Sequence, residues 1–143
     1  MNNLLIFGVG LIGGSVAIEC QKKQMFNHVV GVQREGGTSL SPFVSNGMID
    51  RVSDNLSDDI KQADFIVIAT PVAQIRNILT TISRSLSPKT IVIDVGSTKS
   101  NVMRFAREEL KEKFPQFVGS HPIAGSEQHG PAAAKINLFK NKD

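Results

Sequence analysis

The feature that most constrains the fold is a run of four apolar residues, 4–7, followed at once by glycines at positions 8, 10, 13 and 14. Such a run is typical of a strand buried on both faces. The GxGxxG spacing then predicts a sharp turn, a close approach of a pyrophosphate to the backbone, and a helix that starts close against the sheet. The free N–H groups of that helix would face the phosphates. Strand, turn and helix in this order predict a dinucleotide site, and a plain glycine turn is the alternative.

The helix expected after the glycines carries the only cysteine of the chain. Its spacing places Val16, Ala17 and Cys20 toward the sheet, and Glu19 and Lys22 toward water. We therefore interpret Cys20 as a small buried residue in a reducing compartment, in preference to a reactive thiol.

Composition and charge argue against several classes of partner. The 143 residues are the length of one domain, and 16 Lys and Arg against 13 Asp and Glu give a net charge of +3. The basic residues are scattered and the aromatic residues are all Phe, so no surface for nucleic acid is predicted. No apolar run reaches membrane-spanning length, and no Lys or Arg precedes the apolar N-terminal residues as in a signal peptide. We expect a soluble, cytoplasmic protein that binds neither nucleic acid nor membranes.

Apolar runs and amphipathic segments alternate along the rest of the chain. The alternation predicts an α/β fold with a doubly wound, mainly parallel sheet of the Rossmann type, built by residues 1–143 as one NAD(P)-binding domain. Further strands are expected at residues 29–33, 65–69, 91–93 and 117–119, with a weak one at 50–52. Further helices are expected at residues 57–61, 75–86 and 102–110, with at most a short one at 43–44 in the loop 36–47.

The segment 57–61 also bears on metal binding. Ser57 is the expected N-cap of this helix, with Asp58 and Asp59 in its first turn. A carboxylate pair with no histidine or third acid nearby is weak support for a metal. The two acids are therefore interpreted as helix polarity, and no metal site is predicted.

Ligands of doubly wound sheets bind outside the carboxyl ends of the strands. The chain places small and polar residues there repeatedly, in the glycine turn and at residues 70–71, 94–99 and 121–127. Chemistry from distant parts of the sequence is therefore expected to converge at one edge. Thr70 and Pro71 are expected to shape the nicotinamide pocket, with an ordinary turn as the alternative.

Residue 33 is expected to decide which dinucleotide binds. It lies 20 residues beyond Gly13 (33 minus 13), where NAD sites usually place Asp or Glu on the ribose hydroxyls. Gln33 has no charge to repel a 2′-phosphate, and the planar guanidinium of Arg34 suits one. These residues predict a preference for NADP over NAD; a solvated Arg34, with Glu35 on the ribose, is the alternative. Nearby hydroxyl donors are Thr38 and Ser39.

His121 is the candidate catalytic base. It precedes a proline, which favours an extended backbone from which the ring would project into the cleft. Its imidazole, titrating near neutral pH, can take the proton of an alcohol as hydride leaves the same carbon. A hydrogen-bonded structural histidine is the alternative, and His28 and His129 are assigned no role. The residues predicted to bind the cofactor are Gly8, Val9, Gly10, Leu11, Ile12, Gly13, Gln33, Arg34, Thr38, Ser39, Thr70, Pro71 and Ser97.

Each of the other polar residues at the same edge has a structural or surface interpretation as well as a functional one. Ser97 hydrogen-bonds the nicotinamide or the substrate hydroxyl, or it caps the following helix. Lys99 attracts an anionic substrate or is a solvated helix lysine, and Asp94 is expected to order its turn. Glu127 orients the ligand or controls access, or it is surface charge.

Four segments, in this order and spacing, resemble the prephenate/arogenate dehydrogenases of tyrosine biosynthesis: residues 8–15, 69–72, 94–99 and 121–127. The glycine segment is widespread among dehydrogenases, whereas the last two segments together are specific. The resemblance covers essentially the whole chain. It implies an oxidative decarboxylation, in which NAD(P)⁺ takes hydride from the ring carbon bearing the hydroxyl, carbon dioxide leaves and the ring becomes aromatic.

The resemblance also implies roles for individual residues. His121 would bind and deprotonate the ring hydroxyl of prephenate or arogenate. Ser97 would contact that hydroxyl and the nicotinamide, and Glu127 would lie at the substrate entrance. The pair Gln33-Arg34, in place of the usual acid, resembles the NADP-using members.

The end of the chain differs from the family pattern. Members continue past a segment like 138–141 into another strand and a helical domain, which forms the homodimer and supplies basic residues for the substrate carboxylates. This chain ends at Asp143. The resemblance therefore implies a truncated cofactor domain, and we expect cofactor binding with little or no turnover by this chain alone.

Two other functions compete with this interpretation. A β-hydroxyacid or imine reductase would share the cofactor half but usually carries a catalytic lysine in a later helical domain. A non-catalytic NAD(P)-binding sensor would respond by changing conformation. Replacing His121 with Asn in a complete chain separates these classes, because an enzyme would lose turnover while retaining cofactor and a sensor would respond normally.

Overall fold

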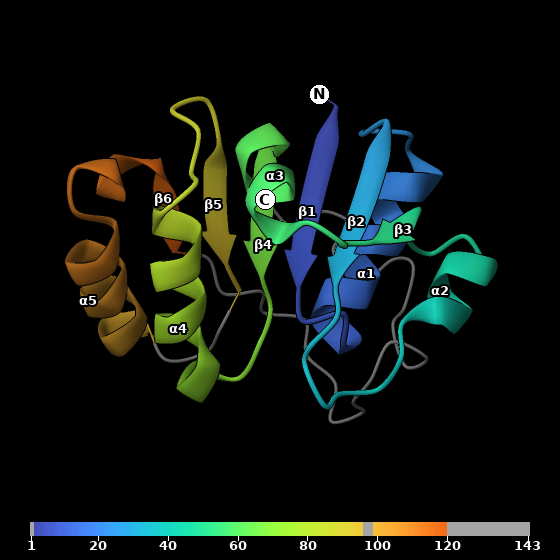
Figure 1. Ribbon diagram of the computed structural model, residues 1–143, viewed down its shortest axis with the longest axis horizontal. Helices are drawn as coiled ribbons and strands as arrows, with labels where there is room; N and C mark the ends of the chain where they lie inside the picture. The colour runs from blue at the N-terminus through green and yellow to red at the C-terminus, as the bar shows by residue number, and fades with distance from the viewer. Residues whose placement is uncertain (1, 96–98, 120–143) are drawn as a thin grey trace.

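The computed structural model describes residues 2–95 and 99–119, which form a sheet covered by helices on both faces (Figure 1). The sheet is parallel throughout, in the order β3-β2-β1-β4-β5-β6. Its strands are β1 (Asn3–Phe7), β2 (His28–Val32), β3 (Arg51–Val52), β4 (Phe65–Ile68), β5 (Ile91–Asp94) and β6 (Phe117–Gly119). The helices are α1 (Leu11–Lys22), α2 (Ser41–Ser45), α3 (Leu56–Gln62), α4 (Val72–Ser83), α5 (Lys99–Leu110) and the 3₁₀ helix η1 (Lys111–Gln116). The predicted doubly wound Rossmann-type fold is confirmed.

The strand order reverses between β1 and β4, which is the position where such sheets bind ligands. Phe7 at the end of β1 is in register with Val32 of β2 and Ile68 of β4. The carboxyl ends of these three strands therefore lie level at one edge of the sheet, the lower edge in Figure 1. The segments that follow them, beginning at residues 8, 33 and 69, emerge side by side.

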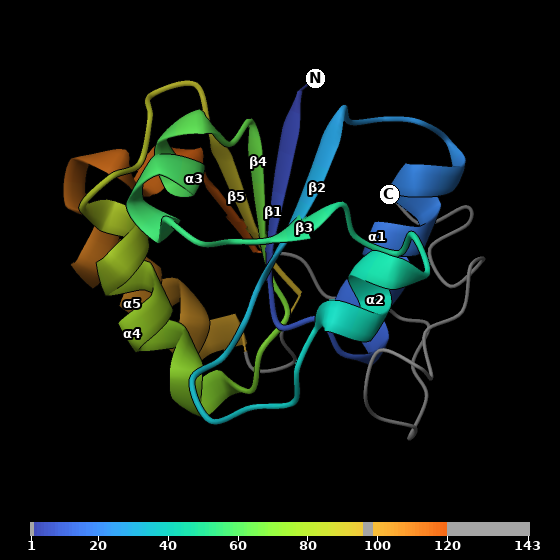
Figure 2. The same ribbon diagram turned by 45° about the vertical axis from the view of Figure 1, so that its right-hand side comes forward.

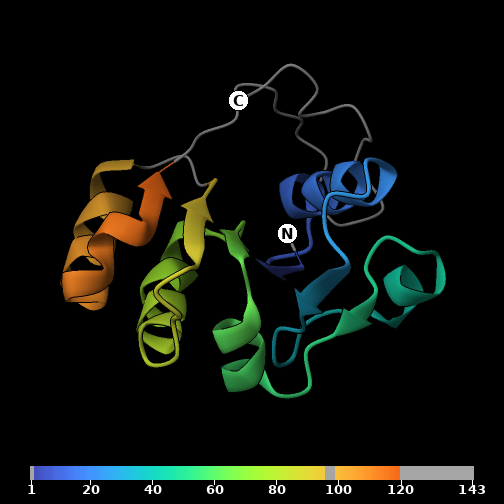
Figure 3. The same ribbon diagram turned by 90° about the horizontal axis from the view of Figure 1, so that it is seen from above.

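Alternate residues of the strands feed two separate cores, one on each face of the sheet. Figures 2 and 3 show α3, α4 and α5 on one face and α1 and α2 on the other. On the first face Leu5 and Phe7 pack with Ile75 and Leu79 of α4, and on the second Leu4 and Ile6 pack with Ala17 of α1. Burial on both faces explains why β1 is an unbroken apolar run. None of the described helices is long and apolar enough to cross a bilayer.

The orientation predicted for Glu19 on α1 is wrong. Its side chain is buried, 3.7 Å from the Lys23 ammonium, and its Oε1 has no hydrogen-bond partner among the described residues. Glu19 lies four residues after Ser15, which is also buried, so the two share a helix face. Cys20 is buried as predicted, and burial, followed by the charge of Glu19, raises the pKa of its thiol to about 11.

The start of α3 also differs from the prediction. The N-cap is Asn55, whose side-chain oxygen accepts a hydrogen bond from the Asp58 backbone N–H at 3.2 Å. Ser57 lies within the first turn, with its hydroxyl 2.9 Å from that of Ser85. Asp59 does more than polarise the helix, because its buried carboxylate accepts two hydrogen bonds from Arg51. This ion pair joins β3 to α3.

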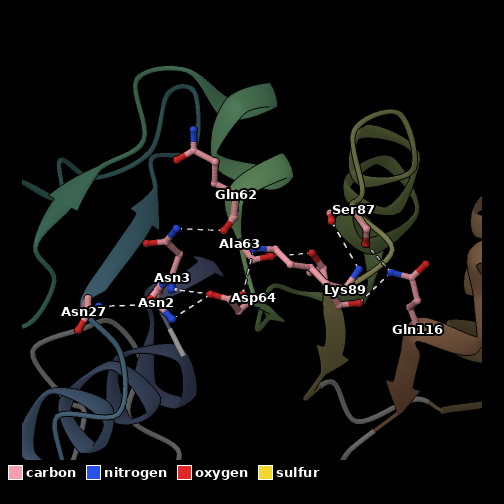
Figure 4. Close-up of polar contacts among 10 residues, drawn as sticks. Asn2, Asn3, Asn27, Gln62, Ala63, Asp64, Ser87, Lys89 and Gln116 are labelled. Atoms are coloured by element: carbon pink, nitrogen blue, oxygen red, sulfur yellow. Dashed lines mark hydrogen bonds and ion pairs between the residues drawn. The ribbon is translucent and has the colours of Figure 1, made fainter.

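The amino-terminal edge of the sheet is closed by bonds between side chains and backbone (Figure 4). The Asp64 carboxylate accepts hydrogen bonds from the backbone N–H groups of Asn2 and Asn3, at 2.9 and 3.0 Å, and lies 3.2 Å from the Lys89 ammonium. The Gln116 amide donates to the carbonyl oxygens of Ser87 and Thr90. The polar groups of this edge are thus largely occupied with one another.

Candidate functional site

A cavity of about 460 Å³ opens at the carboxyl edge, where β1, β2 and β4 end. The glycine turn forms one part of its wall, the loop after β2 another, and the start of α4 a third. Its volume lies within the range of small-molecule and cofactor sites. The lining residues are Phe7, Gly8, Val9, Gly10, Val32, Gln33, Arg34, Gly37, Thr38, Leu40, Phe43, Leu56, Ala69, Thr70, Pro71, Gln74, Asn77, Ile78 and Thr81.

Each glycine of the GxGxxG turn meets a different steric demand. Gly8 has a φ of +87°, and a Cβ there would lie 2.7 Å from the Ala69 carbonyl oxygen. A Cβ at Gly13 would collide with the Gly8 carbonyl oxygen, so this glycine lets α1 pack close to the turn. A Cβ at Gly10, which lines the cavity, would meet no atom of the described residues within 4 Å. Gly10 therefore keeps the backbone accessible to a ligand.

The N-terminus of α1 is available to an anion. Gly10 is its N-cap, none of the described side chains caps it, and its first turn contains no acidic residue. The first-turn N–H groups of an α-helix have no carbonyl partner within the helix. These donors and the positive end of the helix dipole adjoin the cavity wall at Gly10, as a phosphate site requires.

Thr70 lies next to the glycine turn in the wall of the cavity, and the described residues offer its hydroxyl no hydrogen-bond partner. Its Oγ1 is buried and has no hydrogen-bond partner among the described residues, while its Cγ2 lies against the glycine turn at Gly8. A buried hydroxyl without a partner costs free energy. Thr70 and Gly10 both line the cavity, so a ligand bound there would contact the Thr70 side chain and the open backbone at Gly10.

The loop between β2 and α2 forms another part of the cavity wall. The Gln33 side chain is bonded to this loop, through Nε2 to the carbonyl oxygens of Arg34 and Thr38 and through Oε1 to the Leu40 N–H. Arg34 is exposed, and the ion pairs between described residues do not include it. Arg34 therefore lines the cavity as a cation without an ion-pair partner in the described part of the chain.

One wall of the cavity was not expected from the sequence. Gln74, Asn77, Ile78 and Thr81 line it from α4, for which the sequence predicts an amphipathic helix and no part in the site. The buried face predicted for α4 is present, with Ile75, Leu79 and Ile82 against the sheet. The polar positions 74, 77 and 81 have the i, i+3, i+7 spacing of a second stripe, which was the available signal.

The structure brings together most of the residues that the sequence singled out for cofactor binding. Those lining the cavity are Gly8, Val9, Gly10, Gln33, Arg34, Thr38, Thr70 and Pro71. Ser39 instead lines an open hollow on the other side of the loop, and its hydroxyl oxygen accepts from the Ser41 N–H at 3.2 Å. Leu11 begins α1, and Ile12 packs toward the core of the α1 face. Ser97, His121 and Glu127 lie outside the described residues.

The fold, the glycine turn and the cavity at the switch point define a nucleotide-binding domain of the Rossmann type. The family profile described as the nucleotide-binding domain of prephenate dehydrogenase matches residues 16–143. The chain belongs to the prephenate/arogenate dehydrogenase family and corresponds to its N-terminal nucleotide-binding domain.

Individual relatives agree with this assignment. The chain is 36% identical over 141 residues to the prephenate dehydrogenase of Bacillus subtilis, covering 98% of this chain and 38% of that protein. It is 32% identical, with a TM-score of 0.85, to a solved prephenate dehydrogenase of Aquifex aeolicus in complex with hydroxyphenyl propionate and NAD⁺. This match covers 99% of this chain and 48% of that chain. It is 29% identical, with a TM-score of 0.78, to the solved arogenate dehydrogenase of Synechocystis, and the match covers 96% of this chain and 46% of that chain. The chain thus spans less than half the length of these relatives.

Proposed function

We propose that this chain binds NADP(H), or less tightly NAD(H), and forms the cofactor-binding part of an oxidoreductase that oxidatively decarboxylates prephenate or arogenate. The observation that carries the proposal is the cavity at the β1/β4 switch point, which is lined by the open backbone at Gly10 and by Thr70, whose hydroxyl has no hydrogen-bond partner among the described residues. The bound nicotinamide would supply the oxidant, because it accepts a hydride. The family of the chain supports this reaction class.

The residues of the cavity would divide the work of binding. Backbone N–H groups at the start of α1, next to Gly10, would hold the pyrophosphate. The Thr70 hydroxyl would donate a hydrogen bond to the ligand, and the apolar wall formed by Val32 and Ile78 would exclude water from it. Arg34 would pair with a 2′-phosphate.

The preference for NADP rests on charge at the end of β2. Gln33 is neutral and Arg34 is exposed and unpaired among the described residues, so a 2′-phosphate would meet attraction and no repulsion from either side chain. Titrating the purified chain with NADP⁺ and NAD⁺ tests this preference. Tighter binding of NAD⁺ would refute it, and failure to bind either dinucleotide would refute the proposed function.

The catalytic roles proposed for the remaining residues follow from the family motifs. His121 would deprotonate the ring hydroxyl, Ser97 would contact that hydroxyl and the nicotinamide, and Glu127 would lie at the substrate entrance. In a complete protein, His121→Asn is expected to abolish turnover while the dissociation constant of the cofactor stays the same. Retained turnover would remove His121 from the mechanism.

The relatives are more than twice as long as this chain, which affects the activity expected of residues 1–143 alone. The chain corresponds to 38% of the Bacillus subtilis protein. We propose that the rest of such a protein supplies the contacts to the substrate carboxylates and the homodimer interface, and that residues 1–143 alone bind cofactor with little or no turnover. Robust oxidation of prephenate by the purified 143-residue chain would contradict this division.

A further inference from the structure

The side chain of Gln33 hydrogen-bonds to its own loop through both its nitrogen and its oxygen. It follows the last residue of β2 directly, and its Nε2 donates to the carbonyl oxygens of Arg34, at 3.1 Å, and Thr38, at 2.7 Å. Its Oε1 accepts from the Leu40 N–H at 2.8 Å. One side chain therefore ties both ends and the middle of the segment 34–40.

Only an amide satisfies this arrangement. Two of the bonds need donors and the third needs an acceptor, which the two N–H bonds and the carbonyl oxygen of glutamine supply together. A glutamate at position 33 would direct a carboxylate at two carbonyl oxygens and would lose both donors. The acid that usually binds the ribose hydroxyls at this position is thus incompatible with the loop as it is folded here.

The loop that Gln33 holds is otherwise shaped by its glycines and one buried anchor. The Arg34 carbonyl also accepts from the Gly37 N–H at 2.9 Å, which closes a tight turn with Gly36 at a φ of +74°. Leu40 is buried at the far end of the loop. The backbone of Arg34 is therefore fixed from two directions. Its guanidinium has no ion-pair partner among the described residues, and the residue lines both the cavity and the adjoining hollow.

We propose that Gln33 is a positioning residue that sets cofactor choice: its amide holds the loop 34–40 in the conformation that presents Arg34 to the 2′ position of the adenosine ribose. This inference rests on the proposed function and goes beyond it, because neutrality at position 33 is not sufficient. A neutral side chain that cannot make the three bonds loses the NADP preference.

The test compares Gln33→Met, which is neutral and of similar length, and Gln33→Glu with the native chain. The dissociation constants of NADP⁺ and NAD⁺ are measured by titration. Hydrogen exchange at the Leu40 amide and trypsin cleavage after Arg34 report on the loop without any cofactor. The matched control is Gln62→Met on α3, at the opposite edge of the sheet, whose side-chain amide points away from its neighbours in Figure 4.

We expect Gln33→Met to accelerate Leu40 exchange and cleavage after Arg34, and to weaken NADP⁺ binding by roughly tenfold, as the loss of a charged hydrogen bond would. Binding of NAD⁺ should change far less, and Gln62→Met should change neither. Gln33→Glu should lose NADP⁺ without gaining NAD⁺.

Three results would overturn the proposal: unchanged loop protection in Gln33→Met, unchanged NADP⁺ affinity in that variant, or tight NAD⁺ binding by Gln33→Glu with the loop still protected. The native chain separates this proposal from the proposed function. If it binds neither dinucleotide, the proposed function fails, and with it the role in cofactor choice, whereas loop exchange still shows whether Gln33 holds the loop.

Discussion

Thr70 and Gly8 lie next to each other where β1 and β4 end, in the wall of the cavity. Gly8 adopts a positive φ under the Ala69 carbonyl, and the Thr70 hydroxyl is buried without a partner among the described residues. Glycine adopts this φ without strain, whereas the buried Thr70 hydroxyl costs free energy in the unliganded domain. Both lie on the wall of one cavity, so substitutions there are expected to separate stability from ligand binding.

Thr70→Val keeps the shape of the side chain and removes its unsatisfied hydroxyl. The free energy of unfolding without ligand is expected to rise by about 1 kcal/mol, since a buried unpaired polar group is lost. Affinity for the cofactor is expected to fall several-fold, because the hydrogen bond to the ligand is lost. Denaturant unfolding and NADP⁺ titration measure the two effects, and unchanged affinity would show that the hydroxyl does not contact the ligand.

Gly8→Ala and Gly10→Ala form a matched pair. At Gly8 the new Cβ adds strain at φ +87° and lies 2.7 Å from the Ala69 oxygen, so the domain is expected to lose about 2 kcal/mol or more. At Gly10 the new Cβ meets no atom within 4 Å in the part of the chain that the structure describes, so stability should change little while affinity falls. Thermal unfolding and titration of both variants check this. Equal losses of stability would contradict the roles assigned to the two glycines.

Elements are joined by a few polar bonds whose partners come from different segments. Arg51 in β3 and Asp59 in α3 form a bidentate pair, and the Ser53 hydroxyl donates to the same carboxylate. Burial raises the pKa of Asp59, but the hydrogen bonds from Arg51 and Ser53 outweigh it and hold the pKa below its usual value. This cluster fixes the short strand β3 to the helix that follows it.

Asp59→Asn removes one charge of this cluster and keeps the side-chain shape. The free energy of unfolding is expected to fall by about 1–2 kcal/mol, less than for a fully buried pair because Arg51 is half exposed. Asp54→Asn is the matched control, since Asp54 also approaches Arg51, at 3.9 Å, but its side chain is 94% exposed. Urea unfolding compares them, and equal effects would show that the buried pair adds nothing.

Periodicity predicted these elements better than it predicted their polar contacts. Apolar spacing reports burial, so the strands and the buried face of α4 followed from it. The N-cap at Asn55 and the bonds of Gln33 depend on where a loop turns, which spacing does not encode. For the same reason the glycine turn was recognisable as a site from the sequence, whereas the contribution of α4 to the cavity wall was found only in the structure.

The whole molecule has two edges with opposite properties. At the carboxyl edge the cavity is lined by the open backbone at Gly10, by Arg34 and by Thr70, and within residues 2–95 and 99–119 Arg34 has no ion-pair partner and the Thr70 hydroxyl no hydrogen-bond partner. At the amino edge, Asp64 at the start of β4 binds the backbone of Asn2 and Asn3, which lead into and begin β1, so the two halves of the sheet are joined there (Figure 4). The division predicts that stability can be altered at one edge without changing ligand binding at the other.

Asp64→Asn tests that division through its pH dependence. Backbone hydrogen bonds from Asn3 and Asn2 lower the pKa of the Asp64 carboxyl in the folded state, so its stabilisation is present above the unfolded pKa and disappears as pH falls through the folded pKa. At neutral pH the variant should lose about 1–2 kcal/mol of unfolding free energy, with NADP⁺ affinity unchanged.

The loss should shrink as the pH is lowered from about 5 toward 2, because the native carboxyl then becomes protonated and loses its advantage over the amide. Urea unfolding across this range measures the difference between the two proteins. If the difference in unfolding free energy stays constant across this pH range, Asp64 stabilises the fold by its shape and not by its charge. A change in cofactor affinity at neutral pH would show that the two edges are coupled through β1 and β4, and that binding and stability are not separable in this domain.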